Sequence, residues 1–263
     1  MPQKENESSA DQQKRASLMR TIAKNAKRQG NFGLASSLYM QIGEKLKAAK
    51  CLIRKGDTET VIKFADNARS QEIYILTANY LQTSDWHNNP NLMKKIIGFY
   101  TKAKSYHHLA GFYDACASVE IDEYRDYERA SKALEEAVKY ASRTNTDDKE
   151  SKIQVLQQKK HFIDRFIEAR QLAQENPQEM MRICQQLLSN PGADSAVRAG
   201  DVYAQMIELY YQKGDGDSSY KLVQQMQERG IMANRYVDQE MVRNFYVIRV
   251  IFYSWIIFTM QWE

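Results

Sequence analysis

The sequence predicts an all-α fold built from antiparallel helix pairs, and three observations support this prediction. Only four prolines and eleven glycines interrupt the 263 residues, whereas residues that favour helix, such as Ala, Leu, Gln, Lys and Glu, are plentiful. Apolar residues recur at helical spacing along most of the chain. Glycines and capping residues separate these stretches at short intervals. A β-rich fold is therefore not expected.

The clearest repeat unit lies at residues 28–43. Gly30 and Asn31 favour the left-handed backbone that ends one helix. The next helix is then marked by four apolar residues at helical spacing, Phe32, Ala35, Tyr39 and Ile42. This order is typical of a tetratricopeptide-like unit. Such a unit cannot bury its apolar face alone, so we expect a solenoid of stacked neighbours that binds other proteins.

Turn and capping residues place the helices of the first part of the solenoid, residues 12–143. The first two helices are expected at residues 12–29 and 32–42. The next starts and stops are marked by Gly56 as a C-cap, Asp57 or Thr58 as an N-cap, Ser70 as an N-cap, and Asn89 ahead of the first-turn Pro90. Two further apolar stretches, from residue 109 to 119 and from 127 to 141, predict two more helices.

A polar stretch at residues 143–148 predicts a long loop or a joint between two halves, and we place the loop at residues 144–149. The second part of the solenoid, residues 150–243, then begins with a helix of about seven turns that ends near Asn176. Asn176 precedes Pro177, and Glu179 stands where it would complete a capping box. A later helix is expected to stop at residues 214–216.

Both ends of the chain depart from the repeat pattern. Residues 1–11 are polar and predict a disordered lead-in with no secretory signal. Residues 244–263 form an atypical apolar tail. Its uncharged core, residues 250–260, is shorter than the ~18–20 residues that a bilayer span needs. We expect this tail to pack on the last helix pair or to be poorly ordered. The alternative is a membrane anchor, which would make the protein a membrane-tethered helical-repeat adaptor.

Charge is unevenly distributed although the net charge is only +4. Residues 14–55 contain many lysines and arginines and a single acid, Glu44, whereas acids predominate in residues 114–136. Such blocks usually cover solvated helix faces. The functional interpretation is electrostatic steering of acidic and basic partners to opposite ends of one scaffold. Nucleic acid is not an expected partner, because Phe32 and Tyr39 lie on the predicted core face and offer no stacking platform.

Candidate reactive residues are few, and no catalytic, cofactor-binding or metal-binding residue is expected. The sequence lacks a Gly-rich phosphate loop and the GxSxG, HExxH and calcium-loop motifs. His107 and His108 are adjacent and would point about 100° apart on a helix, so they cannot share a metal. His161 and Asp164 have no nucleophile at matching spacing. The protein is therefore not expected to be an enzyme.

The three cysteines, Cys51, Cys116 and Cys184, are far apart and form no CxxC pair. This usage favours reduced thiols in the cytoplasm over a disulfide framework.

Packing roles are expected for seven residues of the repeats. The glycines Gly30, Gly98 and Gly111 are predicted to allow close helix approach, where a β-carbon has no room. Phe32, Ala35, Tyr39 and Phe112 are predicted to fill the apolar stripes between helices.

Several strings are more specific than a generic helical repeat: KGDTE at 55–59, QEIYI at 71–75, ANYLQ at 78–82, IIGFYTK at 96–102, LAGFYDACA at 109–117, VEIDEY at 119–124, RFIEAR at 165–170 and GDVY at 200–203. Together they resemble the carboxyl-terminal tetratricopeptide region of the one-hundred-and-forty-kilodalton subunits of intraflagellar transport complex A. The resemblance extends over roughly residues 14–243, and the segment from Phe245 onward departs from it.

This resemblance implies a non-enzymatic scaffold with no cofactor, which acts in retrograde ciliary transport, in cilium assembly and in the entry of membrane-protein cargo. Its implied partners are other complex A subunits and cargo adaptors, and its implied location is the cytoplasm and the cilium, including basal body and axoneme. Members of this family also have WD-repeat propellers, which this sequence does not contain. We therefore expect the chain to be a fragment or a truncated product.

Overall fold

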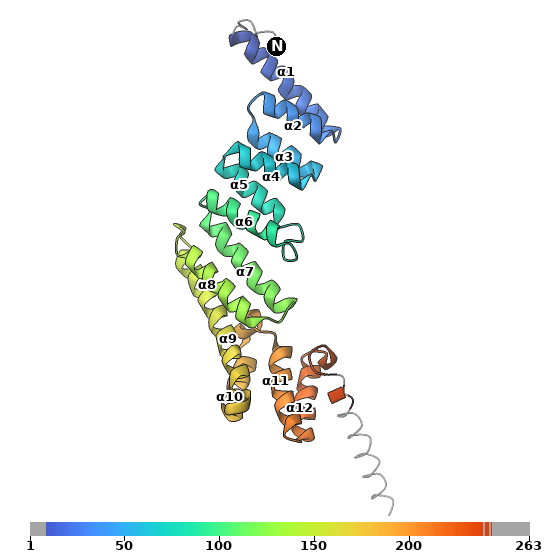
Figure 1. Ribbon diagram of the computed structural model, residues 1–263, viewed down its shortest axis with the longest axis vertical. Helices are drawn as coiled ribbons and strands as arrows, with labels where there is room; N and C mark the ends of the chain where they lie inside the picture. Colours follow the sequence, from blue (N-terminus) through green and yellow to red (C-terminus); the bar gives the residue numbers. More distant parts are fainter. Residues whose placement is uncertain (1–8, 239, 242, 244–263) are drawn as a thin grey trace, which may run out of the picture. The chain divides into compact units, whose positions relative to one another are not determined.

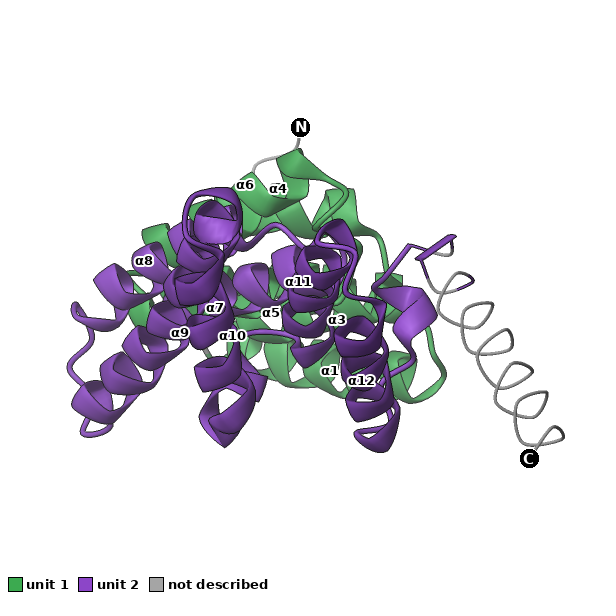
Figure 2. Ribbon diagram, turned by 90° about the horizontal axis from the view of Figure 1, so that it is seen from below, with its two compact units in different colours: residues 1–109 green, residues 110–263 purple. Residues whose placement is uncertain are grey.

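The computed structural model describes residues 9–238, 240, 241 and 243, which form twelve α-helices and two short 3₁₀-helices (Figure 1). No strand occurs among these residues. The chain forms two compact units that divide at residues 109 and 110 (Figure 2). Within each unit, helices that follow one another in the sequence pack together. The predicted all-α class and the helical-repeat architecture are confirmed.

Unit 1 contains six complete helices: α1 Ser9–Arg28, α2 Phe32–Gln41, α3 Lys45–Lys55, α4 Thr58–Ala68, α5 Gln71–Leu81 and α6 Pro90–Lys102. Each helix from α1 to α5 packs on the one that follows it. The core of α1 to α3 is built mainly from small residues around one large side chain, Tyr39: Ala23, Ala26, Ala35, Ala48 and Cys51. Small side chains at these positions let neighbouring helices pack closely while the tyrosine ring fills the space between them.

Local capping chemistry sets most of the helix ends in unit 1. Gly56 ends α3 with φ of 81°, a left-handed conformation that glycine adopts without steric cost. The Asp57 carboxylate then accepts a hydrogen bond from the Thr60 backbone N–H at 3.1 Å and caps α4. Asn89 caps α6 in the same way, with Pro90 in the first turn. Ser70 precedes α5 as predicted, but its side chain makes no capping hydrogen bond.

Unit 2 contains most of α7 Tyr106–Asp122, followed by α8 Tyr127–Ala141, α9 Lys149–Glu175, α10 Pro177–Ser189, the 3₁₀-helix Pro191–Ser195, α11 Ala199–Gln212, α12 Gly216–Glu228 and the 3₁₀-helix Ala233–Arg235. One apolar core joins these helices. At its centre the Tyr127 hydroxyl donates to Asp201 Oδ2 at 2.6 Å, and the Tyr127 ring meets Phe166 edge-on at 4.7 Å. Asp201 is only 9% exposed, and a buried carboxylate needs a hydrogen-bond donor, which Tyr127 supplies.

The capping box predicted at α10 is only half formed. Asn176 Oδ1 accepts from the Glu179 backbone N–H at 3.2 Å, so the amide cap is present. The Glu179 carboxylate does not return to the cap; it binds the Arg182 guanidinium one turn ahead, with Oε2 at 2.7 Å from Nε. A bidentate arginine competes well for a carboxylate, which accounts for the difference.

The division between the units differs from the expected one. A loop was expected at residues 144–149; in the structure residues 142–148 join α8 to α9, which pack against each other within unit 2. This loop is therefore a hairpin connection, and the division falls within α7. At the amino end, α1 already begins at Ser9, so residues 9–11 are helical where a disordered lead-in was expected. The apolar tail at 244–263 and its candidate anchor lie outside the described residues.

Candidate functional site

The predicted packing residues of the first repeat lie at the turn and in the core of α1 to α3. Gly30 has φ of 78°, and a Cβ added there would meet no atom within 4 Å. Glycine is therefore needed at position 30 for the backbone conformation of the turn and not for close packing. Asn31 has φ of −81° and caps α2. Ala35 and Tyr39 are buried, and Phe32 is half-buried against them.

The predicted close approach at Gly98 and Gly111 is wrong. Gly98 is half-buried and Gly111 is exposed, and a Cβ at either position would meet no atom within 4 Å. Phe112, next to Gly111, is 1% exposed and lies in the core. The glycine that does allow close approach is Gly200, where a Cβ would lie 2.4 Å from the Tyr236 ring. Periodicity could not find it, because the tyrosine lies beyond the following helix.

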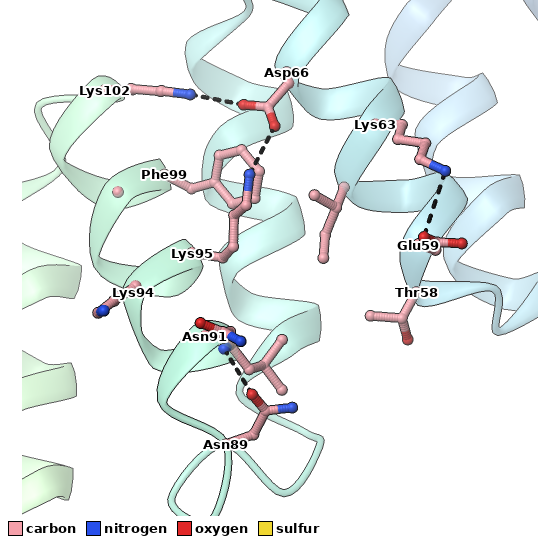
Figure 3. A pocket seen from close by; sticks show the side chains of 13 residues that line it. Thr58, Glu59, Lys63, Asp66, Asn89, Asn91, Lys94, Lys95, Phe99 and Lys102 are labelled. Carbon is pink, nitrogen blue, oxygen red and sulfur yellow. Dashed lines mark hydrogen bonds and ion pairs between the residues drawn. The ribbon is translucent and has the colours of Figure 1, made fainter.

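A groove of about 920 Å³ lies on unit 1 between α4 and α6 and is a candidate for a binding site (Figure 3). Its apolar lining consists of Ile62, Leu92 and Phe99, with Gly98 leaving part of the α6 surface without a side chain. Polar and charged residues complete the lining: Thr58, Glu59, Lys63, Asp66, Asn89, Asn91, Lys94, Lys95 and Lys102. The groove therefore combines an apolar surface with several amino groups.

Asp66 on α4 is the main electrostatic tie between the two sides of the groove. Lys102 Nζ lies 2.7 Å from Asp66 Oδ1, and Lys95 Nζ lies 3.1 Å from Oδ2 (Figure 3). The hydrogen bond from Lys102 is the largest influence that lowers the pKa of Asp66, against an opposing effect of burial. Both ammonium groups also lie over the Phe99 ring, at 5.9 Å for Lys95 and 5.4 Å for Lys102. These contacts hold α6 against α4 and fix the shape of the groove.

Positive charge exceeds negative charge along the groove. The lining has four lysines and two acids, which leaves a formal surplus of two positive charges. Lys63 pairs with Glu59 at 3.5 Å. Lys94 is exposed and lies apart from Asp66 (Figure 3). Its side chain has no ion pair or hydrogen bond to any residue that the structure describes. The groove thus favours a ligand that brings both an apolar side chain and negative charge.

Two of the residues considered for chemistry, His108 and Asp164, make contacts within the fold. His108 stacks on Tyr100 at 5.6 Å, and its Nδ1 lies 2.7 Å from Ser105 Oγ. Asp164 accepts from Ser131 at 2.6 Å and from Lys160 at 2.7 Å. No group of three or more His, Cys, Asp or Glu side chains suited to a metal occurs in the described part of the chain.

The three cysteines are buried and free of disulfides. Burial raises the pKa of Cys116 and of Cys184 to about 12. Both thiols therefore stay protonated and unreactive at neutral pH. Among residues 9–238, 240, 241 and 243, no helix has both the length and the apolarity that crossing a membrane requires.

Comparison with known families assigns both parts of the chain. Residues 1–99 match the model of the TPR domain shared by intraflagellar transport proteins 140 and 172, and residues 107–227 match that of the C-terminal TPR domain of intraflagellar transport protein 140. Together the two matches cover most of the helical repeats. TPR domains are protein-interaction modules, and intraflagellar transport places proteins of this type in the cilium. The chain belongs to the family of intraflagellar transport protein 140 and contains its C-terminal TPR region.

Proposed function

We propose that this chain is a protein-binding scaffold within intraflagellar transport complex A, and that it serves retrograde ciliary transport, cilium assembly and the entry of membrane-protein cargo. The family match supports the scaffold role. The expected partners are other complex A subunits, with cargo adaptors as a second class, and the expected locations are the cytoplasm, basal body and axoneme.

The α4–α6 groove is the single observation that gives this role a physical site. Its three apolar residues and its surplus of lysines complement a segment in which one or two apolar side chains are flanked by Asp or Glu. Asp66 already forms ion pairs with Lys95 and Lys102, whereas the Lys94 side chain has no ion-pair partner among the described residues. A partner carboxylate that pairs with Lys94 would therefore displace no existing ion pair.

Co-expression with each complex A subunit, followed by affinity purification, tests the proposal. The full chain should retain at least one subunit. The double variant Lys63→Glu/Lys94→Glu should weaken that retention, because it reverses charge at the groove without touching the apolar core. Lys14→Glu/Lys45→Glu is the matched control, since it makes the same change in net charge at exposed residues of α1 and α3.

Two results would count against the proposal in different ways. If the unaltered chain retains no subunit, the scaffold role itself is refuted. If a subunit is retained equally by both double variants, the α4–α6 groove is not its binding site. Microscopy of the tagged chain in ciliated cells tests the location separately, and absence of signal from basal bodies and axonemes would contradict it.

A further inference from the structure

A second pocket of unit 1 is lined almost entirely by cations. It has a volume of about 630 Å³, and its lining consists of Lys24, Lys27, Arg28, Tyr39, Lys47, Lys50, Cys51 and Arg54. Six of these eight residues are Lys or Arg, and none is an acid. The sequence shows that this part of the chain is basic, but only the folded unit shows that cations of α1 and α3 gather around one concavity.

Most of these cationic side chains form no ion pair with the residues that the structure describes. Lys47 binds Glu44 at 2.7 Å and lies 5.8 Å from the centre of the Tyr39 ring. The side chains of the other five, Lys24, Lys27, Arg28, Lys50 and Arg54, have no ion pair or hydrogen bond to any described residue. All five are exposed around a floor formed by buried Tyr39 and Cys51. Unpaired like charges that face one concavity repel each other, so an anion bound there would relieve this repulsion.

The charges converge from two different helices. Lys27 of α1 and Arg54 of α3 both act on the buried Cys51 thiol, where they oppose the rise in its pKa that burial causes. Both cations line the same pocket as Cys51. The helix dipole favours cations in a last turn and accounts for Lys27, Arg28 and Arg54 in this way. It does not account for Lys24 and Lys50, which stand earlier in α1 and α3.

We propose that this pocket binds a compact polyanion with two or more phosphate groups, either as a soluble inositol phosphate or as the headgroup of a phosphoinositide. The volume lies within the range of about 300–1,000 Å³ that is typical of small-ligand sites, and the guanidinium groups of Arg28 and Arg54 suit bidentate binding of phosphate. An extended nucleic acid fits less well, because the only aromatic residue of the lining, Tyr39, is buried and offers no face for base stacking. This inference is independent of the protein partner proposed above.

Calorimetric titration of the full chain with inositol trisphosphate and with inositol hexakisphosphate tests the pocket directly. We expect binding at one site, weakened by salt, with a rise in melting temperature because the ligand stabilises the folded unit. Lys24→Gln/Lys50→Gln should lower the affinity by about tenfold to a hundredfold, which corresponds to the loss of charge-assisted hydrogen bonds. Lys14→Gln/Lys45→Gln is the matched control, because it removes two exposed lysines from the same helices but outside the pocket.

Vesicles of phosphatidylcholine with and without phosphatidylinositol bisphosphate identify the source of the phosphates. Binding to the phosphoinositide vesicles that soluble inositol trisphosphate displaces would support the lipid headgroup. Binding of the soluble compound alone would support a free inositol phosphate.

Three results would overturn the inference. One is absence of binding to every phosphate compound, and another is an equal loss of affinity in the pocket variant and the matched control. The third is tighter binding of an acidic peptide such as hexaglutamate, which would make the pocket a protein-binding site. Circular dichroism of both variants shows whether they are folded. Lys24→Arg/Lys50→Arg preserves both charges and should retain binding, so it tests the pocket if the glutamine variant is misfolded.

Discussion

Replacing Gly200 with alanine should destabilise unit 2, although alanine is normally the better helix former. Gly200 lies in the first turn of α11, and an added Cβ would lie 2.4, 2.4 and 2.6 Å from three ring carbons of Tyr236. Carbon atoms in contact normally stand about 3.5–4.0 Å apart, so the ring would have to move by about 1 Å. That movement is opposed by the Arg198 guanidinium, which donates to the Tyr236 hydroxyl at 2.8 Å. Overpacking of this kind costs about 1–3 kcal/mol.

The assay is chemical and thermal denaturation of the full chain, and each kcal/mol should lower the melting temperature of a unit of this size by about 2–4 °C. The same substitution in a Tyr236→Ala background should carry no penalty, because the space is then empty. Gly111→Ala is the matched control in an exposed helical position with no neighbour, and it should stabilise by about 0.5–1 kcal/mol. An effect of Gly200→Ala equal to that of Gly111→Ala, or an equal cost with and without the tyrosine ring, would rule out a steric role for Gly200.

Three further substitutions test other parts of unit 2. Tyr127→Phe removes the hydroxyl that donates to Asp201 Oδ2 at 2.6 Å. Arg125 Nε still lies 3.6 Å from the other carboxylate oxygen, and the lost hydrogen bond should cost about 1–3 kcal/mol in urea denaturation; an unchanged midpoint would contradict this. Asn176→Ala removes the cap of α10 and should cost about 0.5–2 kcal/mol, whereas Asn176→Asp should retain most of the stability. Burial raises the pKa of Glu208 above its ordinary value of 4.5. The folded state therefore holds the carboxyl proton of Glu208 more tightly than the unfolded state does, and the free energy of unfolding falls as pH rises through the folded pKa. Glu208→Gln should therefore stabilise the protein at neutral pH and have less effect below pH 4.5; the opposite trend would show that ionised Glu208 is stabilised by its surroundings.

Local sequence was sufficient where a feature depends on neighbours in the chain. The Gly56 turn and the caps at Asn89 and Asn176 were predicted correctly, and Asp57 is the one of the two expected residues that caps α4. Each of these features involves residues within three positions of the helix start or end. Apolar periodicity predicted the helices for the same reason. The family resemblance likewise depends on short strings, and the family matches confirm it.

Features that depend on distant residues were not accessible in this way. Whether a glycine is needed for space depends on what the fold brings to it, which is nothing at Gly98 and Gly111 and the Tyr236 ring at Gly200. The α4–α6 groove depends on Asp66 meeting lysines 29 and 36 residues further along the chain. The apolar periodicity of a single helix predicts neither the contact of Gly200 with Tyr236 nor the ion pairs of Asp66.

The sequence by itself determined the helical class, most helix ends and the family, because backbone propensity, capping and apolar spacing act over a few residues. Only the tertiary structure decided which cations converge in one pocket, which carboxylates are paired and which glycine is sterically required. These properties arise from the distances between side chains of different helices, and those distances are set by how the apolar faces pack.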